Sequence, residues 1–316
     1  MSSPITLFTV VVFGQFDIIC VFLALCGIYF FYKKKYYKFV IMFGLAITFK
    51  AYMLFILIPL ILLIEKRVLH IIKYLLISSW CMILERLLFL NDPYCSLSKN
   101  YIHDTYGFMK RIYNYGVNLQ VGPVFLLGIV MVFVCVFAYR QKKDPLIVTP
   151  YSYYLSFLVN AALILSIHWH PQWMIILVPF LVINTFMFSE FKLSVYLQYF
   201  MFAFFLIETY MVFYKNVDQA MINNGILPLL TGKYLSPDSV TYASLLDKLK
   251  LPVSVYNTLL IGCGLSFAYL FKPAPSLPAG NDQPESDFDH RLIWGNLGLI
   301  YIYIIPTLII YFLKAV

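Results

Sequence analysis

The chain has 316 residues, of which 62% are hydrophobic and 12% charged, and its formal net charge is +8. A soluble domain carries roughly 25% charged residues, and a soluble core could not hide this much apolar surface, so the bilayer is expected to serve as the solvent. The basic residues lie in short segments between apolar runs, without an interleaved aromatic platform. This placement argues against nucleic acid as a partner.

Nine apolar runs follow one another along the chain, and most match the roughly 20 residues that a helix needs to cross a bilayer. They cover residues 5–32, 39–64, 68–90, 121–139, 148–167, 173–188, 194–214, 254–271 and 292–313. The pattern predicts an all-α polytopic membrane protein with about nine to ten transmembrane helices. A single transmembrane domain is expected to cover residues 1–316.

The first run is interrupted by Gly14, Gln15 and Asp17. An ionised carboxylate at mid-bilayer costs several kcal/mol, so this motif is expected at a membrane interface. A short stub precedes it, and a span runs from about Asp17 to Tyr32. The lysines that follow mark the cytoplasmic end of that span.

The second run, residues 39–64, has basic clusters at both ends and Lys50 at its centre. A single span would leave Lys50 in hydrocarbon and one cluster on the outer side. A hairpin of two half-spans that turns near Lys50 avoids both problems, because both clusters then lie inside and Lys50 lies toward the outer face. The alternative is one span with Lys50 buried within the helix bundle.

The remaining runs then alternate in direction, and the inner loops carry most of the Lys and Arg although they are shorter. Outer loops are expected at 91–120 and 216–252, and both are long enough to have structure of their own. The segment 272–291 is rich in proline and acidic residues, which predicts a solvated inner linker.

This topology brings three polar motifs to the outer membrane edge: Gly14 to Asp17, Lys50, and the turn from His168 to Trp173. Asp17 is a candidate general base or ligand for a substrate hydroxyl, or alternatively a helix N-cap. Gln15 beside it favours a site.

The turn from His168 to Trp173 carries His168, His170, Gln172 and Trp173, which suit phosphate or sugar hydroxyls and sugar-ring stacking. The two histidines could also ligate a metal, but no third ligand is close in sequence, so no metal ligand is assigned. Alternatively, the tryptophans are interfacial belt residues and the proline makes the turn.

Two further charged residues stand out. Arg86 could hold the phosphate of a lipid carrier near the outer end of its run, or alternatively belong to a solvated surface beside the loop that follows. Glu208 lies inside a span, where a carboxylate is costly, unless it is satisfied by a partner.

Four stretches, in this order and spacing, resemble bacterial membrane glycosyltransferases of the GT-C class over residues 1 to about 190. They are Gly14-Gln15-Phe16-Asp17, the run from Phe43 to Lys50, Pro59-Leu60 before Glu65-Lys66-Arg67, and the turn from His168 to Trp173.

The resemblance implies a multi-pass enzyme of the bacterial plasma membrane. It would move a sugar from a polyprenyl-phosphate carrier to a glycan or lipid-linked acceptor at the extracytoplasmic face, with no cofactor assigned and with a divalent metal left open. Asp17 would be the catalytic carboxylate, and Lys50 and Arg86 would lie near the carrier phosphate. The turn from His168 to Trp173 would surround the sugar or phosphate.

Only about thirteen residues precede the Gly14 motif, whereas the resembled class begins with a complete helix and a long acidic outer loop. The chain is therefore expected to be short at its N-terminus. Asp92 or Asp104 could take the catalytic role, or a complementing subunit could supply it. The alternatives are a transporter or flippase of lipid-linked glycans, and a non-catalytic membrane subunit.

Overall fold

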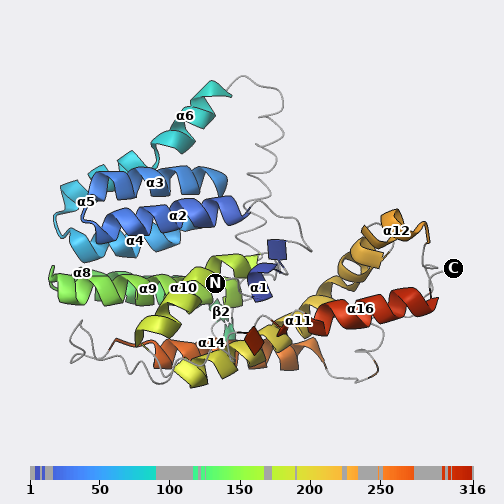
Figure 1. Cartoon of the computed structure of the whole chain (residues 1–316). Coiled ribbons are helices and arrows are strands. Elements are labelled where there is room, and N and C mark those ends of the chain that lie inside the picture. Colours follow the sequence, from blue (N-terminus) through green and yellow to red (C-terminus); the bar gives the residue numbers. More distant parts are fainter. Residues whose placement is uncertain are drawn as a thin grey trace. The chain divides into compact units, whose positions relative to one another are not determined.

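The computed structural model describes residues 4–7, 9–10, 17–89, 117–119, 122–124, 126–166, 173–188, 191–222, 226–233, 248, 252–273, 294–295, 298–299 and 301–314. The chain divides into two compact units (Figure 1). The first comprises Phe16–Asn184 with Pro273–Ala279, and we call it the Asp17 unit. The second comprises Met1–Gln15, Thr185–Lys272 and Gly280–Val316, and we call it the Glu208 unit. The expected single transmembrane domain stays a prediction.

Helices dominate the Asp17 unit. Its elements are α2 (Asp17–Tyr32), α3 (Tyr36–Phe49), α4 (Met53–Ile64), α5 (Val68–Ser78), α6 (Trp80–Leu88), β1 (Val117–Leu119), β2 (Gly122–Val124), α8 (Leu126–Arg140), α9 (Pro145–Ser166) and α10 (Met174–Phe188), the last of which runs on into the Glu208 unit. Helix α2 begins at Asp17 and ends just before the lysine cluster, as the sequence predicts for the first span.

Helices α2 and α3 pack antiparallel and very closely. Phe31 stacks edge-on against Phe39, with ring centroids 5.1 Å apart. A Cβ atom on Gly27 would lie 2.6 Å from the ring of Phe43, so only glycine allows this approach. The two helices therefore form a closely packed pair, and the N-terminus of α2 lies beside the C-terminus of α3.

The second apolar run is a helical hairpin. Helix α3 ends at Lys50, whose backbone is extended (φ −150°, ψ 111°). The N–H of Met53 then donates to the carbonyl of Lys50 over 3.1 Å, which closes the turn into α4. The chain thus reverses where the lone lysine lies in the sequence.

The third run, expected as one span over 68–90, is broken into α5 and α6 at Ser79. The hydroxyls of Ser78 and Ser79 both donate to the carbonyl of Leu75, at 2.7 and 2.9 Å. Such local bonds compete with the helical ladder and bend helices. The structure therefore divides this apolar run into two helices.

The helix directions separate two ends of this unit. Lys66 at the end of α4 bonds to Ala138 near the end of α8, so these helices run the same way. Tyr52 at the start of α4 packs with Leu127 at the start of α8. Helices α2, α4 and α8 start at one end, and α3, α5 and α9 start at the other. We call these the Asp17 end and the basic end.

A small antiparallel ladder begins at the end of the segment that was expected to be an outer loop at 91–120 and continues into the next apolar run. Strand β1 pairs with β2 in the register Val117↔Val124, Asn118↔Pro123 and Leu119↔Gly122. It shows that the end of this segment has structure of its own. Residues 90–116 lie outside the described part.

The Glu208 unit contains α1 (Pro4–Leu7), α11 (Phe191–Ile222), α12 (Ile226–Thr231), α14 (Val253–Leu270) and α16 (Tyr301–Lys314). Helix α11 continues to Ile222, eight residues beyond the apolar run that predicts it, so the segment 216–252 begins as helix. The hydroxyl of Tyr311 donates to the carbonyl of Lys233 over 2.7 Å and also contacts Thr231, which ties α16 to α12.

Among the described residues, two helices are long and apolar enough to cross a membrane: Pro145–Leu165 and Phe191–Thr209. Other apolar helices have 10–17 residues, and at 1.5 Å per residue they measure ~15–26 Å. A typical hydrocarbon core is about 30 Å thick. The all-helical expectation is supported apart from the short ladder, but nine to ten spans are not confirmed. The turns at Lys50 and Ser79 divide the second and third apolar runs into shorter helices.

Candidate functional site

Asp17 opens helix α2, and its side chain is only 2% exposed. Its Oδ1 accepts an ion pair from Lys50 Nζ at 3.0 Å. Its Oδ2 is buried and has no hydrogen-bond partner among the described residues. An unsatisfied buried carboxylate oxygen costs free energy and calls for an explanation. Asp17 therefore keeps one buried acceptor position without a described partner.

Lys50 approaches Asp17 from the end of α3, because the hairpin turn follows it directly. Its side chain remains 38% exposed while it contacts the buried carboxylate. An ammonium has three N–H donors, so the contact with Asp17 leaves donors for another anionic group. The pair thus combines a buried acceptor with an accessible cation.

Cys20 and Tyr52 extend the site around this ion pair. Cys20 lies one turn after Asp17, and its Sγ donates to the Asp17 carbonyl over 3.1 Å. The Tyr52 hydroxyl lies 3.8 Å from the same sulfur. Tyr52 comes from the hairpin turn, so three consecutive helices contribute to one cluster.

Trp173 forms an aromatic wall with Tyr52, with ring centroids 6.0 Å apart and an interplanar angle of 51°. Both rings pack against the buried residues Leu127, Ala162 and Leu163. This apolar support fixes the rings at the Asp17 end. Aromatic rings held in this way can stack on the apolar face of a sugar.

The structure therefore brings together three of the predicted site residues: Asp17, Lys50 and Trp173. Arg86 lies in α6, but its side chain is outside the described part. The other four predicted residues, Gln15, His168, His170 and Gln172, also lie outside the described residues. Among the described residues, no group of three or more His, Cys, Asp or Glu could hold a metal ion.

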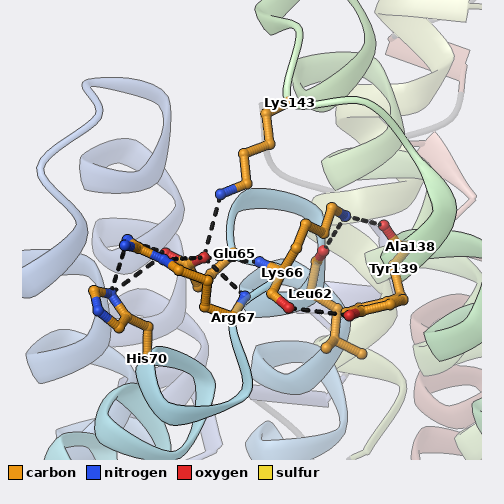
Figure 2. Close-up of polar contacts among 8 residues, drawn as sticks. All are labelled: Leu62, Glu65, Lys66, Arg67, His70, Ala138, Tyr139 and Lys143. Atoms are coloured by element: carbon orange, nitrogen blue, oxygen red, sulfur yellow. Dashed lines mark hydrogen bonds and ion pairs between the residues drawn. The ribbon is translucent and has the colours of Figure 1, made fainter.

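Glu65, at the basic end, differs from Asp17 in how its oxygens are satisfied (Figure 2). Its Oε1 accepts the backbone N–H groups of Lys66 and Arg67 at 2.9 and 3.0 Å, and the ammonium of Lys143 at 3.2 Å. Its Oε2 faces Arg67 at 3.4 Å and His70 at 3.6 Å. Both oxygens are occupied, which suits a structural role.

Burial raises the pKa of the Glu65 carboxyl, but hydrogen bonds from Arg67, Lys66 and Lys143 outweigh burial and hold that pKa well below its ordinary value. Lys66 behaves in the opposite way. Burial and the nearby ammonium of Lys143 lower the pKa of Lys66 to about 8, against the attraction of Glu65. Lys66 also donates to the carbonyls of Leu62 and Ala138, so it caps α4 and joins it to α8.

Glu208 is the buried carboxylate of the other unit. It lies in α11 and is 3% exposed. Its Oε2 has no hydrogen-bond partner among the described residues. The neighbouring Thr209 bonds instead to the carbonyl of Phe205 over 2.7 Å.

Sequence reasoning missed Cys20 and Tyr52, which it read as parts of apolar runs. A signal was present for each. Cys20 follows Asp17 at helical spacing, and Tyr52 lies two residues beyond Lys50 in a predicted turn. For the Glu65 cluster, the sequence predicted only a basic segment at the end of the second apolar run.

Comparisons with protein families, curated proteins and solved structures found no match for this chain. The function is therefore argued from its own residues.

Proposed function

We propose that this protein is a membrane-embedded glycosyltransferase that moves a sugar from a polyprenyl-phosphate carrier to a hydroxyl acceptor at the Asp17 end. The observation that carries the proposal is the buried Asp17 carboxylate, which pairs with Lys50 and leaves Oδ2 open. The described part of the Asp17 unit holds no other carboxylate with this combination of burial and free acceptor.

A membrane location is supported by the outward faces of the Asp17 unit. Large apolar side chains there are exposed, among them Phe22 at 62%, Leu69 at 79% and Phe133 at 73%. A soluble monomer rarely exposes so many large apolar side chains, whereas lipid would cover them. Most of the described lysines and arginines of the unit lie instead in the α2–α3, α4–α5 and α8–α9 connections or next to them.

The proposed step uses Asp17 as a general base. The acceptor hydroxyl oxygen attacks the anomeric carbon of the carrier-bound sugar, and the hydroxyl proton passes to Asp17 Oδ2. The bond between that carbon and the carrier phosphate oxygen breaks, and polyprenyl phosphate leaves with the bonding electron pair. A single displacement of this kind inverts the anomeric centre.

Lys50 and the aromatic wall have supporting roles in this proposal. The remaining N–H donors of Lys50 stabilise the negative charge that grows on the leaving phosphate. Trp173 and Tyr52 supply a flat apolar surface for the sugar ring. The N-termini of α2, α4 and α8 point toward this end and add positive potential, which also favours an anion.

The test is sugar transfer in membranes that contain the overproduced protein, with a panel of radiolabelled polyprenyl-phosphate hexoses as donors. Asp17→Asn is expected to lower transfer at least about 100-fold, because a general base contributes roughly that much. Asp144→Asn is the matched control, since Asp144 is exposed and its side chain accepts only the N–H of Leu146 among the described contacts. Full transfer by Asp17→Asn at unchanged protein level would exclude Asp17 as the base.

A second candidate function, transport of a lipid-linked glycan coupled to an ion or proton, is favoured by Glu208. A buried carboxylate with a free oxygen inside a long apolar helix is a typical position for a coupling group. In that case Glu208→Gln would abolish flux in proteoliposomes, and Asp17→Asn would leave it intact.

A further inference from the structure

The basic end of the Asp17 unit presents three cationic or imidazole side chains around one carboxylate (Figure 2). Glu65 is nearly buried, with its side chain 8% exposed, whereas Arg67, His70 and Lys143 are 69%, 47% and 48% exposed. These side chains come from the α4–α5 and α8–α9 connections. Glu65 thus holds one side of Arg67 and of Lys143, and Arg67 in turn contacts His70, which leaves the other side of each group open.

The contacts to Glu65 are loose enough to leave binding capacity. Arg67 reaches the carboxylate at 3.4 Å through both Nε and an Nη atom, whereas tight charged pairs measure about 2.7–2.9 Å. The same Arg67 Nη lies 3.1 Å from His70 Nδ1. Nδ1 then accepts this bond, which makes Nε2 the protonated ring nitrogen and a donor.

Positive charge at this end exceeds negative charge in the described residues. Glu65 and Asp144 are the described acidic residues here, and the basic residues are Lys33, Lys34, Lys35, Lys38, Lys66, Arg67, Lys73, Arg140, Lys142 and Lys143. The single carboxylate of Glu65 cannot neutralise both Arg67 and Lys143, which contact it. An anion would complete the cluster.

Exposed tyrosines lie beside lysines at the basic end of the unit. Tyr29, Tyr32, Tyr37 and Tyr139 are each between 45% and 57% exposed. Lysine ammonium groups lie 5.5–5.8 Å from the centres of these rings. Amphipathic rings and lysines with apolar stems are typical of the headgroup zone of a membrane.

We propose that Arg67, His70 and Lys143, oriented by Glu65, form a binding site for the phosphate of an anionic phospholipid headgroup. The fork of Nε and Nη2 donors of Arg67 faces Glu65 and His70, and its Nη1 keeps N–H donors for a phosphate oxygen. The ammonium of Lys143 and His70 Nε2 add donors from the flanks. This inference rests on the membrane location within the proposed function and is independent of sugar transfer.

Diffuse attraction between a basic surface and an anionic bilayer is the alternative, and Glu65 distinguishes the two. Glu65→Gln makes the basic end more positive, so diffuse attraction would strengthen lipid binding. An oriented site would bind more weakly, because Arg67 and Lys143 lose the carboxylate that positions them.

The experiment measures lipid binding by the delipidated, detergent-purified full chain, with native mass spectrometry as the readout. The probes are phosphatidylglycerol, phosphatidylcholine with the same acyl chains, and free glycerol phosphate as competitor. Ionic strength is set at about 1 M, where the Debye length is roughly 3 Å and diffuse attraction is screened. Lys143→Gln is compared with Lys142→Gln, an equal charge change at the neighbouring residue.

Phosphatidylglycerol is expected to bind wild type in preference to phosphatidylcholine, and Lys143→Gln is expected to weaken this binding about tenfold. Lys142→Gln is expected to bind as wild type does, and Glu65→Gln more weakly. If Glu65→Gln does not fold, Arg67→Lys replaces it, since it keeps the charge but removes the fork and should also bind more weakly.

Equal losses in Lys142→Gln and Lys143→Gln, or tighter binding by Glu65→Gln, would overturn the proposal. If free glycerol phosphate at equal concentration displaced phosphatidylglycerol, the site would bind a free phosphate compound and not a lipid headgroup. Sugar transfer by the same variants is measured in parallel. Because these residues lie at the opposite end from Asp17, loss of lipid binding with transfer retained separates the two proposals.

Discussion

Two carboxylates of the Asp17 unit differ in how many of their oxygens have a hydrogen-bond or ion-pair partner. Both oxygens of Glu65 accept from backbone N–H groups or cations, and these contacts hold its pKa low. Asp17 has one oxygen in an ion pair and the other buried without a described partner. A saturated carboxylate stabilises a fold, whereas an open one can accept a substrate proton.

The double variant Asp17→Asn with Lys50→Gln separates a structural ion pair from a catalytic one. It removes both charges together and leaves two neutral amides of similar size, so thermal stability in detergent is expected to stay within about 1 kcal/mol of wild type. Sugar transfer is expected to remain at least about 100-fold lower, since Asn cannot take a proton from the acceptor.

Each single variant of the pair serves as the control in a double-mutant cycle. Wild-type transfer by the stable double variant would mean that the Asp17–Lys50 contact only joins α2 to α3. In that event the proposed chemistry would have to be abandoned.

Helix packing depends on glycine where α3 meets α5. A Cβ atom on Gly44 would lie 2.7 Å from the carbonyl oxygen of Ser78, which belongs to the backbone and cannot turn away. Gly44→Ala is therefore expected to destabilise the protein by about 1–3 kcal/mol. The measurement is the thermal unfolding midpoint in detergent.

Gly262→Ala is the matched control within α14. Nothing lies within 4 Å of a Cβ atom at that position, and the residue is exposed. Alanine is a better helix former than glycine by about 1 kcal/mol, so this variant is expected to be equally or more stable. A destabilisation of Gly262→Ala as large as that of Gly44→Ala would show that the close approach of α3 and α5 is not what matters.

Helix boundaries set by charge could be predicted from the sequence. Asp17 starts α2 and Lys50 ends α3, because an ionised side chain is costly inside an apolar run. The break at Ser79 could not be predicted, since Ser residues occur within many membrane helices and only the bonds to Leu75 reveal the bend. The extension of α11 to Ile222 depends likewise on tertiary context.

Part of the candidate site could also be predicted from the cost of burying charged side chains in the membrane. Opposite charges at two expected interfaces on one side of the membrane predict that Asp17 and Lys50 lie close together, and they form an ion pair. The cluster of Cys20 and Tyr52 depends on helix rotation and side-chain direction, which residue type alone does not specify. The catalytic role of Asp17 and the substrate-binding role of Lys50 stay predictions.

Across the Asp17 unit, chemistry is divided between two ends. One end holds a buried open carboxylate, a single described lysine and an aromatic wall. The other holds a saturated carboxylate within a large excess of basic residues. Exposed apolar side chains cover the helices between them. This arrangement suits a bundle in lipid with donor chemistry at one face and anionic lipid contacts at the other.

The central claim is that this single chain carries out sugar transfer at the Asp17 end. Its most direct test is transfer by the detergent-purified full chain in liposomes, with a defined polyprenyl-phosphate hexose and a hydroxyl acceptor. We predict a glycosylated product with inverted anomeric configuration, formed by wild type and lost in Asp17→Asn. Equal rates for wild type and Asp17→Asn, or a product with retained configuration, would contradict the account.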